Sequence, residues 1–251
     1  MDEFTQNTPQ RRIALLIDGD NARPTLIAQY IAEAGKYGAV TLRRIYGDWT
    51  TNNMKGWKEG LNNHAVQPIQ QFRYTIGKNA TDSSLIIDAM DILHSRLVDG
   101  FCIVSSDSDY TRLSTRIREA GIFVMGIGEN KTPKPFVNAC NLFIFTENLL
   151  PKPAPAKVSL TSKGRSKKVV EPPKPDPLPI LRQAFELAAS EDGWAHLSVV
   201  GNQIHQLDPS FDPRTFGFKQ LSQLIKAQKT HFELKYEKES GPSALYVRMK
   251  D

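Results

Sequence analysis

Long hydrophobic runs are absent from this sequence. No stretch approaches the roughly 20 apolar residues that a membrane-spanning helix needs, and the opening MDEFTQNTPQRR has no apolar segment of the kind found in secretory signal peptides. Cysteine is also scarce, because Cys102 and Cys140 are the only two in 251 residues. Two cysteines are too few for a disulfide framework and are interpreted as core thiols. We therefore expect a cytoplasmic protein with no membrane partner.

Net charge is absent from most of the chain. Residues 1–150 contain 16 basic and 16 acidic residues, and residues 180–251 contain nine of each. The whole excess of +5 lies in residues 151–179, which also hold eight of the 16 prolines. We predict a solvated, flexible linker there between two domains. Its basic residues serve either solubility or the attraction of a polyanion such as RNA.

Apolar, β-favouring runs alternate with helical patterns through residues 1–150. The expected strands are IALLI, VTLRRIYG, FCIVSS, IFVMGIG and LFIFT, and the expected helices are TLIAQYIAEAGKYG, DSSLIIDAMDILHSR and DYTRLSTRIREAG. Gly35 and Gly121 stand where helix C-terminal caps belong. Because runs such as residues 13–17 show no polar alternation, we predict an α/β domain whose central, mostly parallel sheet is flanked by helices.

Acidic side chains follow two of the predicted strands. Asp18, Asp20 and Asn21 come directly after the first strand, and Asp107 and Asp109 come after the strand FCIVSS. Ligands of open α/β sheets bind beyond the carboxyl ends of the strands. We therefore expect these side chains to lie close together at one edge of the sheet.

A further acid, Asp82, is the first residue of the predicted helix DSSLIIDAMDILHSR. Any one of these acids alone could be a helix cap or a turn residue. Several carboxylates at one edge repel one another, however, and a hard cation held by oxygen ligands removes that repulsion. Mg²⁺ or Mn²⁺ in such a place polarises a phosphodiester and makes a bound water nucleophilic. The pattern predicts a metal site suited to phosphodiester hydrolysis.

Three motifs in this order and at this spacing resemble the NYN domain, a branch of the PIN-like metal-dependent ribonucleases, over about residues 11–148. They are LLIDGDNA, KNATDSSLIIDAMDIL and VSSDSDYTRLSTRIREAG. The resemblance implies a PIN-like fold and endonucleolytic cleavage of RNA, with one or two Mg²⁺ or Mn²⁺ ions as cofactor. The implied active-site residues are Asp18, Asn21, Asp82, Asp107 and Asp109, of which the four aspartates are the implied metal ligands.

Other residues near these motifs have weaker assignments. Asp20 falls where the family varies and is a secondary candidate. Asp88 matches a recurrent acid, but six residues past Asp82 it has turned roughly 240° around a helix, so a supporting role is expected. Lys78 matches a basic residue often found before the helix motif, and either contacts a phosphate or pairs with an acid.

An RNA groove has further candidate residues. They are Arg43, Arg44, Arg73 and Tyr74. The alternative for each is a solvated side chain near the end of a strand.

Residues 180–251 show the pattern of a winged helix. The expected helices are ILRQAFELAAS, LSVVGNQIHQL and DPRTFGFKQLSQLIKAQ, followed by the strands HFELKYE and SALYVRM. The pattern FDPRTFGFKQLSQLIKAQ followed by FELKYE resembles the OST-HTH module, also called LOTUS, which implies binding of RNA or of a protein partner. Lys219, Lys226 and Lys229, placed on the expected third helix, are the candidate RNA contacts.

Three functions are consistent with these features. We favour a metal-dependent endoribonuclease with an RNA-targeting winged helix. A non-catalytic RNA-binding or scaffold protein with the same fold is the second. The third is a phosphohydrolase of the haloacid dehalogenase kind, in which Asp18 of the DGD motif attacks phosphorus. That family usually continues with Thr or Val and a Gly-rich turn, whereas Asn21 and Ala22 follow here.

Overall fold

The computed structural model describes residues 10–72, 80–150, 176–237 and 244–250. The chain divides into two compact units: the first contains the residues up to Leu149 together with Asp208–Phe211, and the second contains the rest. Most of the expected linker, residues 151–175, lies outside the described residues. Each unit is therefore considered by itself.

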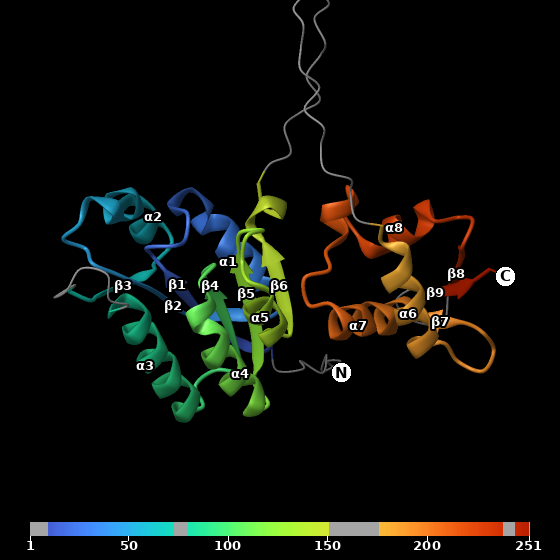
Figure 1. Ribbon diagram of the computed structural model, residues 1–251, viewed down its shortest axis with the longest axis horizontal. Helices are drawn as coiled ribbons and strands as arrows, with labels where there is room; N and C mark the ends of the chain where they lie inside the picture. Colours follow the sequence, from blue (N-terminus) through green and yellow to red (C-terminus); the bar gives the residue numbers. More distant parts are fainter. Residues whose placement is uncertain (1–9, 73–79, 151–175, 238–243, 251) are drawn as a thin grey trace, which may run out of the picture. The chain divides into compact units, whose positions relative to one another are not determined.

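A six-stranded sheet is the centre of the first unit, with the strand order β3-β2-β1-β4-β5-β6 (Figure 1). Every pairing in this sheet is parallel, which confirms the predicted sheet. The strands are β1 (Arg12–Asp18), β2 (Ala39–Gly47), β3 (Gln67–Gln70), β4 (Gly100–Val104), β5 (Phe123–Gly128) and β6 (Leu142–Phe145).

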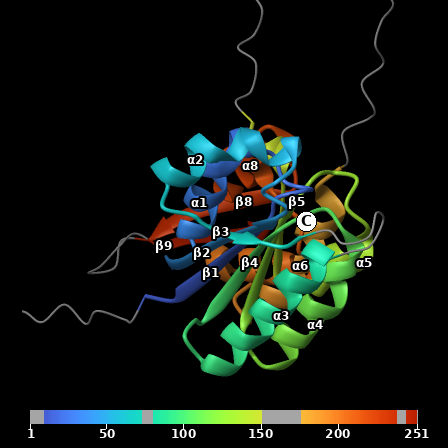
Figure 2. The same cartoon turned by 90° about the vertical axis from the view of Figure 1, so that its left-hand side faces the viewer.

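Helices cover both faces of this sheet, as Figure 2 shows for α1 and α2 on one side and α3 and α4 on the other. The α-helices are α1 (Ile27–Gly35), α2 (Lys58–Asn63), α3 (Ala80–Ser95), α4 (Thr111–Glu119) and α5 (Lys134–Ala139). Short 3-10 helices precede or follow them: η1 (Pro24–Leu26), η2 (Asn52–Trp57), η3 (Ser108–Tyr110) and η4 (Thr146–Asn148).

Two hydrophobic cores explain why β1 has no polar alternation. Ile13, Leu15 and Ile17 pack into the core that contains the buried residues of α1 and α2. Ala14 and Leu16 point to the other face and pack into the core beneath α3, α4 and α5. Each fully buried leucine or isoleucine stabilises the fold by about 1.5–3 kcal/mol. Positions 13–17 of this strand are therefore all apolar, and the strand then ends at Asp18 on the acidic edge of the sheet.

One predicted helix cap is wrong and another is confirmed. Gly121 follows α4 with φ +75°, the left-handed conformation of a C-terminal glycine. Gly35 instead lies inside α1, and the helix is capped by Lys36 in a right-handed conformation. The amides of Lys36 and Tyr37 donate to the carbonyls of Glu33 and Ala34, so the chain leaves the helix without a left-handed residue.

The second unit has the elements of a winged helix. Its helices are α6 (Leu178–Ala188), α7 (Leu197–Leu207) and α8 (Leu221–Ala227), with the 3-10 helix η5 (Pro213–Phe216) before α8. An antiparallel sheet in the order β7-β9-β8 completes it, formed by β7 (Ala195–His196), β8 (Phe232–Glu237) and β9 (Ala244–Met249).

The expected third helix of this unit is broken, which corrects the prediction of one helix over residues 212–228. Asp212 caps η5 by accepting a hydrogen bond from the amide of Arg214, and Gly217 then takes φ +94° and ends the turn. The helix α8 starts only at Leu221. Of the three candidate lysines, only Lys226 lies on that helix; Lys219 precedes it and Lys229 follows it.

Candidate metal centre

Asp18 is the last residue of β1 and has no accessible surface. Its Oδ2 accepts hydrogen bonds from Asn21 Nδ2 at 2.8 Å and from Ser105 Oγ at 2.9 Å, and its Oδ1 accepts one from the amide of Asp20 at 3.2 Å. Burial raises the pKa of Asp18 to about 6, although the bonds from Asn21 and Ser105 act in the opposite direction. The predicted site residue Asn21 thus orients a buried carboxylate.

Three other acids from the predicted set form a compact cluster. One carboxylate oxygen of each of Asp82, Asp107 and Asp109 lies within 4.8 Å of the other two. Asp82 is in the first turn of α3, whereas Asp107 caps η3 and Asp109 lies within it. Asp82 and Asp107 are half-buried, and Asp109 is exposed. The cluster, called the acidic triad below, does not include Asp18.

Ser105 links Asp18 to the triad. Its hydroxyl donates to Asp18 Oδ2 and accepts from the amide of Asp107 at 3.0 Å. The two segments meet because β1 and β4 are parallel neighbours, with Ile17 opposite Val104. Their carboxyl ends therefore reach the same edge of the sheet, as the sequence predicts.

Tyr110 positions Asp82 across two helices. The tyrosine is fully buried, and its hydroxyl donates to Asp82 Oδ1 at 2.7 Å. Burial raises the pKa of Asp82; the hydrogen bond from Tyr110 lowers it, and the charges of Asp107 and Asp109 raise it again. This carboxylate is thus crowded by like charges, and its hydrogen-bond partner is a neutral hydroxyl.

Asp20, only a secondary candidate from the sequence, is hydrogen-bonded to the helix that carries Asp82. The hydroxyl of Thr81, in the first turn of α3, donates to Asp20 Oδ2 at 3.0 Å. This bond joins the loop after β1 to the helix that carries Asp82. The negative charge of Asp20 also contributes to raising the pKa of both Asp18 and Asp82.

The donor set fits Mg²⁺ or Mn²⁺. Both ions prefer oxygen ligands, and the triad offers three carboxylates from two helix starts. Neutral hydroxyl and amide donors hold the surrounding carboxylates, as in metal sites whose outer groups orient the ligands.

Asp88 lies apart from the triad and supports the fold. Its carboxylate accepts hydrogen bonds from Arg44 and Tyr46 of β2, which ties the middle of α3 to the sheet. Arg44 is thus held in an ion pair with Asp88.

The two neighbouring arginines of β2 cannot line a single groove. Adjacent residues of a strand point to opposite faces of its sheet. Arg43 donates to the carbonyl of His64 at 2.9 Å, on the face opposite to Arg44 and Asp88. The other candidates near the helix motif, Arg73, Tyr74 and Lys78, lie outside the described residues.

The second unit has a basic groove of about 270 Å³ beside an exposed aromatic ring. Tyr236 is 66 % exposed and lines this groove at the end of β8. The other lining residues are Lys226, Lys229, Phe232, Glu233, Leu234 and Lys250. Two of the candidate lysines therefore lie together, whereas Lys219 is not part of this groove.

Three residues of the site are not among the candidates that the sequence indicates. Thr81, Ser105 and Tyr110 lie inside the family motifs, but serine, threonine and tyrosine are common at helix starts and turns. Their partners Asp20, Asp18 and Asp82 are 28 to 87 residues away in sequence.

Among the described residues, no helix is both long and apolar enough to cross a membrane.

Comparisons with known structures return distant matches. A Vibrio parahaemolyticus protein of unknown function is 19 % identical, with a TM-score of 0.47; the match covers 55 % of this chain and 94 % of that one. An uncharacterised Nitrosomonas europaea protein is 31 % identical, with a TM-score of 0.28 and coverage of 37 % and 91 %. The WlbA dehydrogenase of Bordetella pertussis is 16 % identical, with a TM-score of 0.32 and coverage of 56 % and 36 %. No curated protein matches significantly.

Family models identify both parts of the chain. The NYN domain model matches residues 12–149, and the OST-HTH/LOTUS domain model matches residues 168–243. The first match spans the whole parallel sheet, Asp18 and the acidic triad. The second spans the winged-helix elements as far as β8. The chain thus belongs to the NYN domain family and carries an OST-HTH/LOTUS domain after its NYN domain.

Proposed function

We propose that this protein is a metal-dependent endoribonuclease whose metal is held at the acidic triad. The observation that carries this proposal is the convergence of Asp82, Asp107 and Asp109 within 4.8 Å, beside the buried Asp18. The NYN domain belongs to a nuclease superfamily, which favours hydrolysis of a phosphodiester. The accompanying OST-HTH/LOTUS domain favours RNA as the substrate.

Each side chain has a distinct task in this proposal. The triad carboxylates would hold Mg²⁺ or Mn²⁺, with Asp18 as the inner acid of the site. When bound, such an ion neutralises charge on a phosphodiester and lowers the pKa of a water. Tyr110 fixes the orientation of Asp82, and Ser105 and Asn21 fix that of Asp18. Preset ligands avoid the cost of reorganisation during the reaction.

Asp18 is poorly suited to act as the nucleophile of a haloacid dehalogenase. Such a carboxylate must contact phosphorus, whereas Asp18 has no accessible surface. Its two oxygens already accept bonds from Asn21, Ser105 and Asp20. The second hypothesis, a non-catalytic RNA-binding protein, is separated from ours by the cleavage assay below.

The winged-helix domain would bring RNA to this centre through its basic groove. Lysine side chains contact phosphates as point charges, and an exposed aromatic ring stacks on an unpaired base. Lys226, Lys229 and Lys250 line the same groove as the exposed Tyr236, so both kinds of contact are available there. We propose single-stranded RNA as the ligand of this groove.

Cleavage of labelled RNA by the full chain tests the nuclease proposal. Single-stranded and structured RNAs are incubated with Mn²⁺, Mg²⁺ or EDTA. We expect internal cleavage with metal, none with EDTA, and a loss of more than about 100-fold in Asp107→Asn. Asp91→Asn is the matched control, because Asp91 is an exposed acid of α3 outside the triad. Cleavage that persists in EDTA or in Asp107→Asn would refute the proposed centre.

A further inference from the structure

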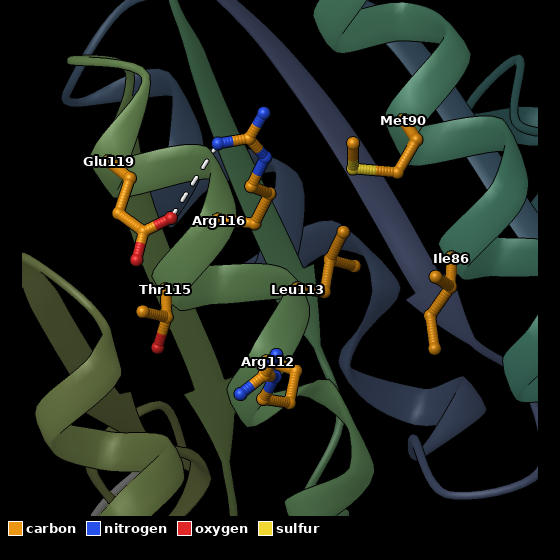
Figure 3. A pocket seen from close by; sticks show the side chains of 7 residues that line it. All are labelled: Ile86, Met90, Arg112, Leu113, Thr115, Arg116 and Glu119. Atoms are coloured by element: carbon orange, nitrogen blue, oxygen red, sulfur yellow. Dashed lines mark ion pairs between the residues drawn. The ribbon is translucent and has the colours of Figure 1, made fainter.

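A groove of about 310 Å³ lies between α3 and α4 on the first unit (Figure 3). One wall consists of Ile86 and Met90 from α3. The other wall comes from α4, with the side chains of Arg112, Leu113, Thr115, Arg116 and Glu119. An apolar wall therefore faces a wall that carries two arginines.

The α3 wall continues the line of the acidic triad. Asp82, Ile86 and Met90 are spaced four residues apart on α3, so their side chains share one face of the helix. Asp82 is the triad member at the start of this face, and Ile86 and Met90 are half-buried along it. The groove therefore begins one helical turn from the proposed metal ligands.

The α4 wall starts beside the triad as well. Asp109 lies in η3, which runs directly into α4, and Arg112 is the second residue of that helix. Arg112 and Arg116 are one turn apart, about 6 Å along the axis. This rise is comparable with the spacing of successive phosphates in an extended strand. The two guanidinium groups thus follow the triad in a row.

Both arginines can bind an anion. Arg112 is exposed and has no ion pair within the part of the chain that the structure describes. Arg116 pairs with Glu119 at 3.7 Å, with both side chains 59 % exposed, an arrangement worth little in water. By contrast, Arg118 on the same helix donates to the carbonyl of Asn138 at 2.9 Å. Two of the three guanidinium groups of α4 therefore lie on the groove side.

The two walls match the two sides of a polynucleotide strand. Guanidinium groups bind phosphate oxygens with paired hydrogen bonds, whereas triad carboxylates without metal repel them. Ile86 and the flexible, polarisable side chain of Met90 offer apolar contact to a base or ribose. A strand that lies along the groove therefore places its backbone on α4 and its bases toward α3.

We propose that the α3–α4 groove holds the RNA strand adjacent to the scissile phosphate, with Arg112 and Arg116 binding its next two phosphates. The inference rests on the proposed function for the identity of the ligand. It assigns a path for the strand and two binding residues on α4, in place of the arginines of β2.

Fluorescence anisotropy of a labelled single-stranded RNA tests this path. The full chain carries Asp107→Asn throughout, so that the RNA stays intact, and affinity is measured over a range of salt concentrations. Arg112→Gln/Arg116→Gln should bind on the order of tenfold more weakly. Its log–log salt slope should fall by about 1.4, because each phosphate contact in a single strand contributes about 0.7. Arg118→Gln is the matched control and should stay within about twofold of the parent.

The outcomes separate this inference from the nuclease proposal. Affinity and salt slope equal to those of the parent in the double variant would overturn the groove, whether or not the wild-type chain cleaves RNA. If the double variant binds RNA more weakly but the wild-type chain cleaves no RNA, the result would support the groove and refute the nuclease proposal. Unchanged circular dichroism and melting temperature in all variants are expected, because these arginines are exposed.

Discussion

A single hydroxyl group decides how one carboxylate of the triad is presented. Tyr110 is buried beneath the site, and its bond to Asp82 joins η3 to α3. Groups that orient metal ligands from outside contribute on the order of 10- to 100-fold to metal affinity or activity. Tyr110 is therefore as informative a target as the acids themselves.

Tyr110→Phe should lower metal-dependent RNA cleavage by roughly tenfold and weaken metal binding in parallel. The ring still fills its space, so the free energy of unfolding should fall by only about 1 kcal/mol. Tyr30→Phe is the matched control, since it is equally buried and loses only a hydrogen bond from the amide of Arg23. Titration of Mn²⁺ against cleavage rate measures both effects. Equal rates and metal affinities in the two variants would contradict the role of Tyr110.

An ion pair at the opposite end of β1 gives the fold a pH dependence. Arg12 hydrogen-bonds to Asp99 through its side chain and its amide, which lowers the pKa of Asp99 to about 2. Because the pKa of Asp99 is lower in the folded than in the unfolded state, the pair stabilises the fold fully above the unfolded pKa of about 4. This stabilisation is lost as the pH falls toward 2.

Asp99→Asn should therefore unfold at lower urea concentration than the wild type at pH 7, with the difference disappearing between about pH 4 and pH 2. Asp91→Asn, another exposed acid of the same unit, should match the wild type throughout. Urea unfolding followed by circular dichroism measures the midpoints. A difference between wild type and Asp99→Asn that persists unchanged at pH 2 would show that its origin is not electrostatic.

At the scale of elements, apolar periodicity predicted the strands on which the site depends. The segments β4, β5, β6 and residues 13–17 of β1 are nearly continuous apolar runs, which can be recognised in a sequence because both faces of the strand are buried. Strand β2 contains Arg43 and Arg44 and is only partly buried, and its β-favouring residues predict it instead. The sequence pattern predicts no element in residues 52–70. Their strand β3 is QPIQ, a short edge strand with a proline and two glutamines, so its pairing with β2 leaves no apolar signature.

The prediction of one continuous third helix in the winged-helix domain is wrong for a different reason. Its sequence keeps helical spacing across a glycine, and periodicity alone does not report the sign of φ. Gly217 adopts φ +94°, and a Cβ at this position would meet no heavy atom within 4 Å. Backbone conformation alone, and not packing, therefore requires glycine there.

Gly217→Ala should destabilise the second unit by about 1–2 kcal/mol, the cost of a left-handed conformation with a side chain. Gly201→Ala should have the opposite sign, with a gain of up to about 1 kcal/mol, because Gly201 lies within α7 and its added Cβ makes only an ordinary contact. Urea unfolding of the two full-length variants compares them. A stable Gly217→Ala protein would show that α8 can extend across this position.

At the scale of the whole molecule, the first unit contains every acid of the proposed centre. Two cores on either side of one sheet hold its helices in place. A unit with its own core and its own sheet can fold when separated from its neighbour.

A chain that ends at Leu150 should therefore give a cooperative unfolding transition and retain metal-dependent cleavage at high RNA concentration. Its affinity for RNA should fall, because the basic segment 151–179 and the groove around Tyr236 are missing. Calorimetry and cleavage rates over a range of RNA concentrations measure these properties, beside the full chain. Failure of this fragment to fold would show that the NYN domain needs the rest of the chain.

The pairing of β1 with β4 sets the moment in synthesis at which the centre can exist. Asp18 leaves the ribosome early, but the hydroxyl that holds it belongs to Ser105, 87 residues later, and the remaining acids extend to Asp109. Until those residues emerge, β1 lacks its neighbour in the sheet and the carboxylates lie on unconnected segments. A growing chain therefore cannot assemble the proposed metal centre before Asp109 has emerged from the ribosome.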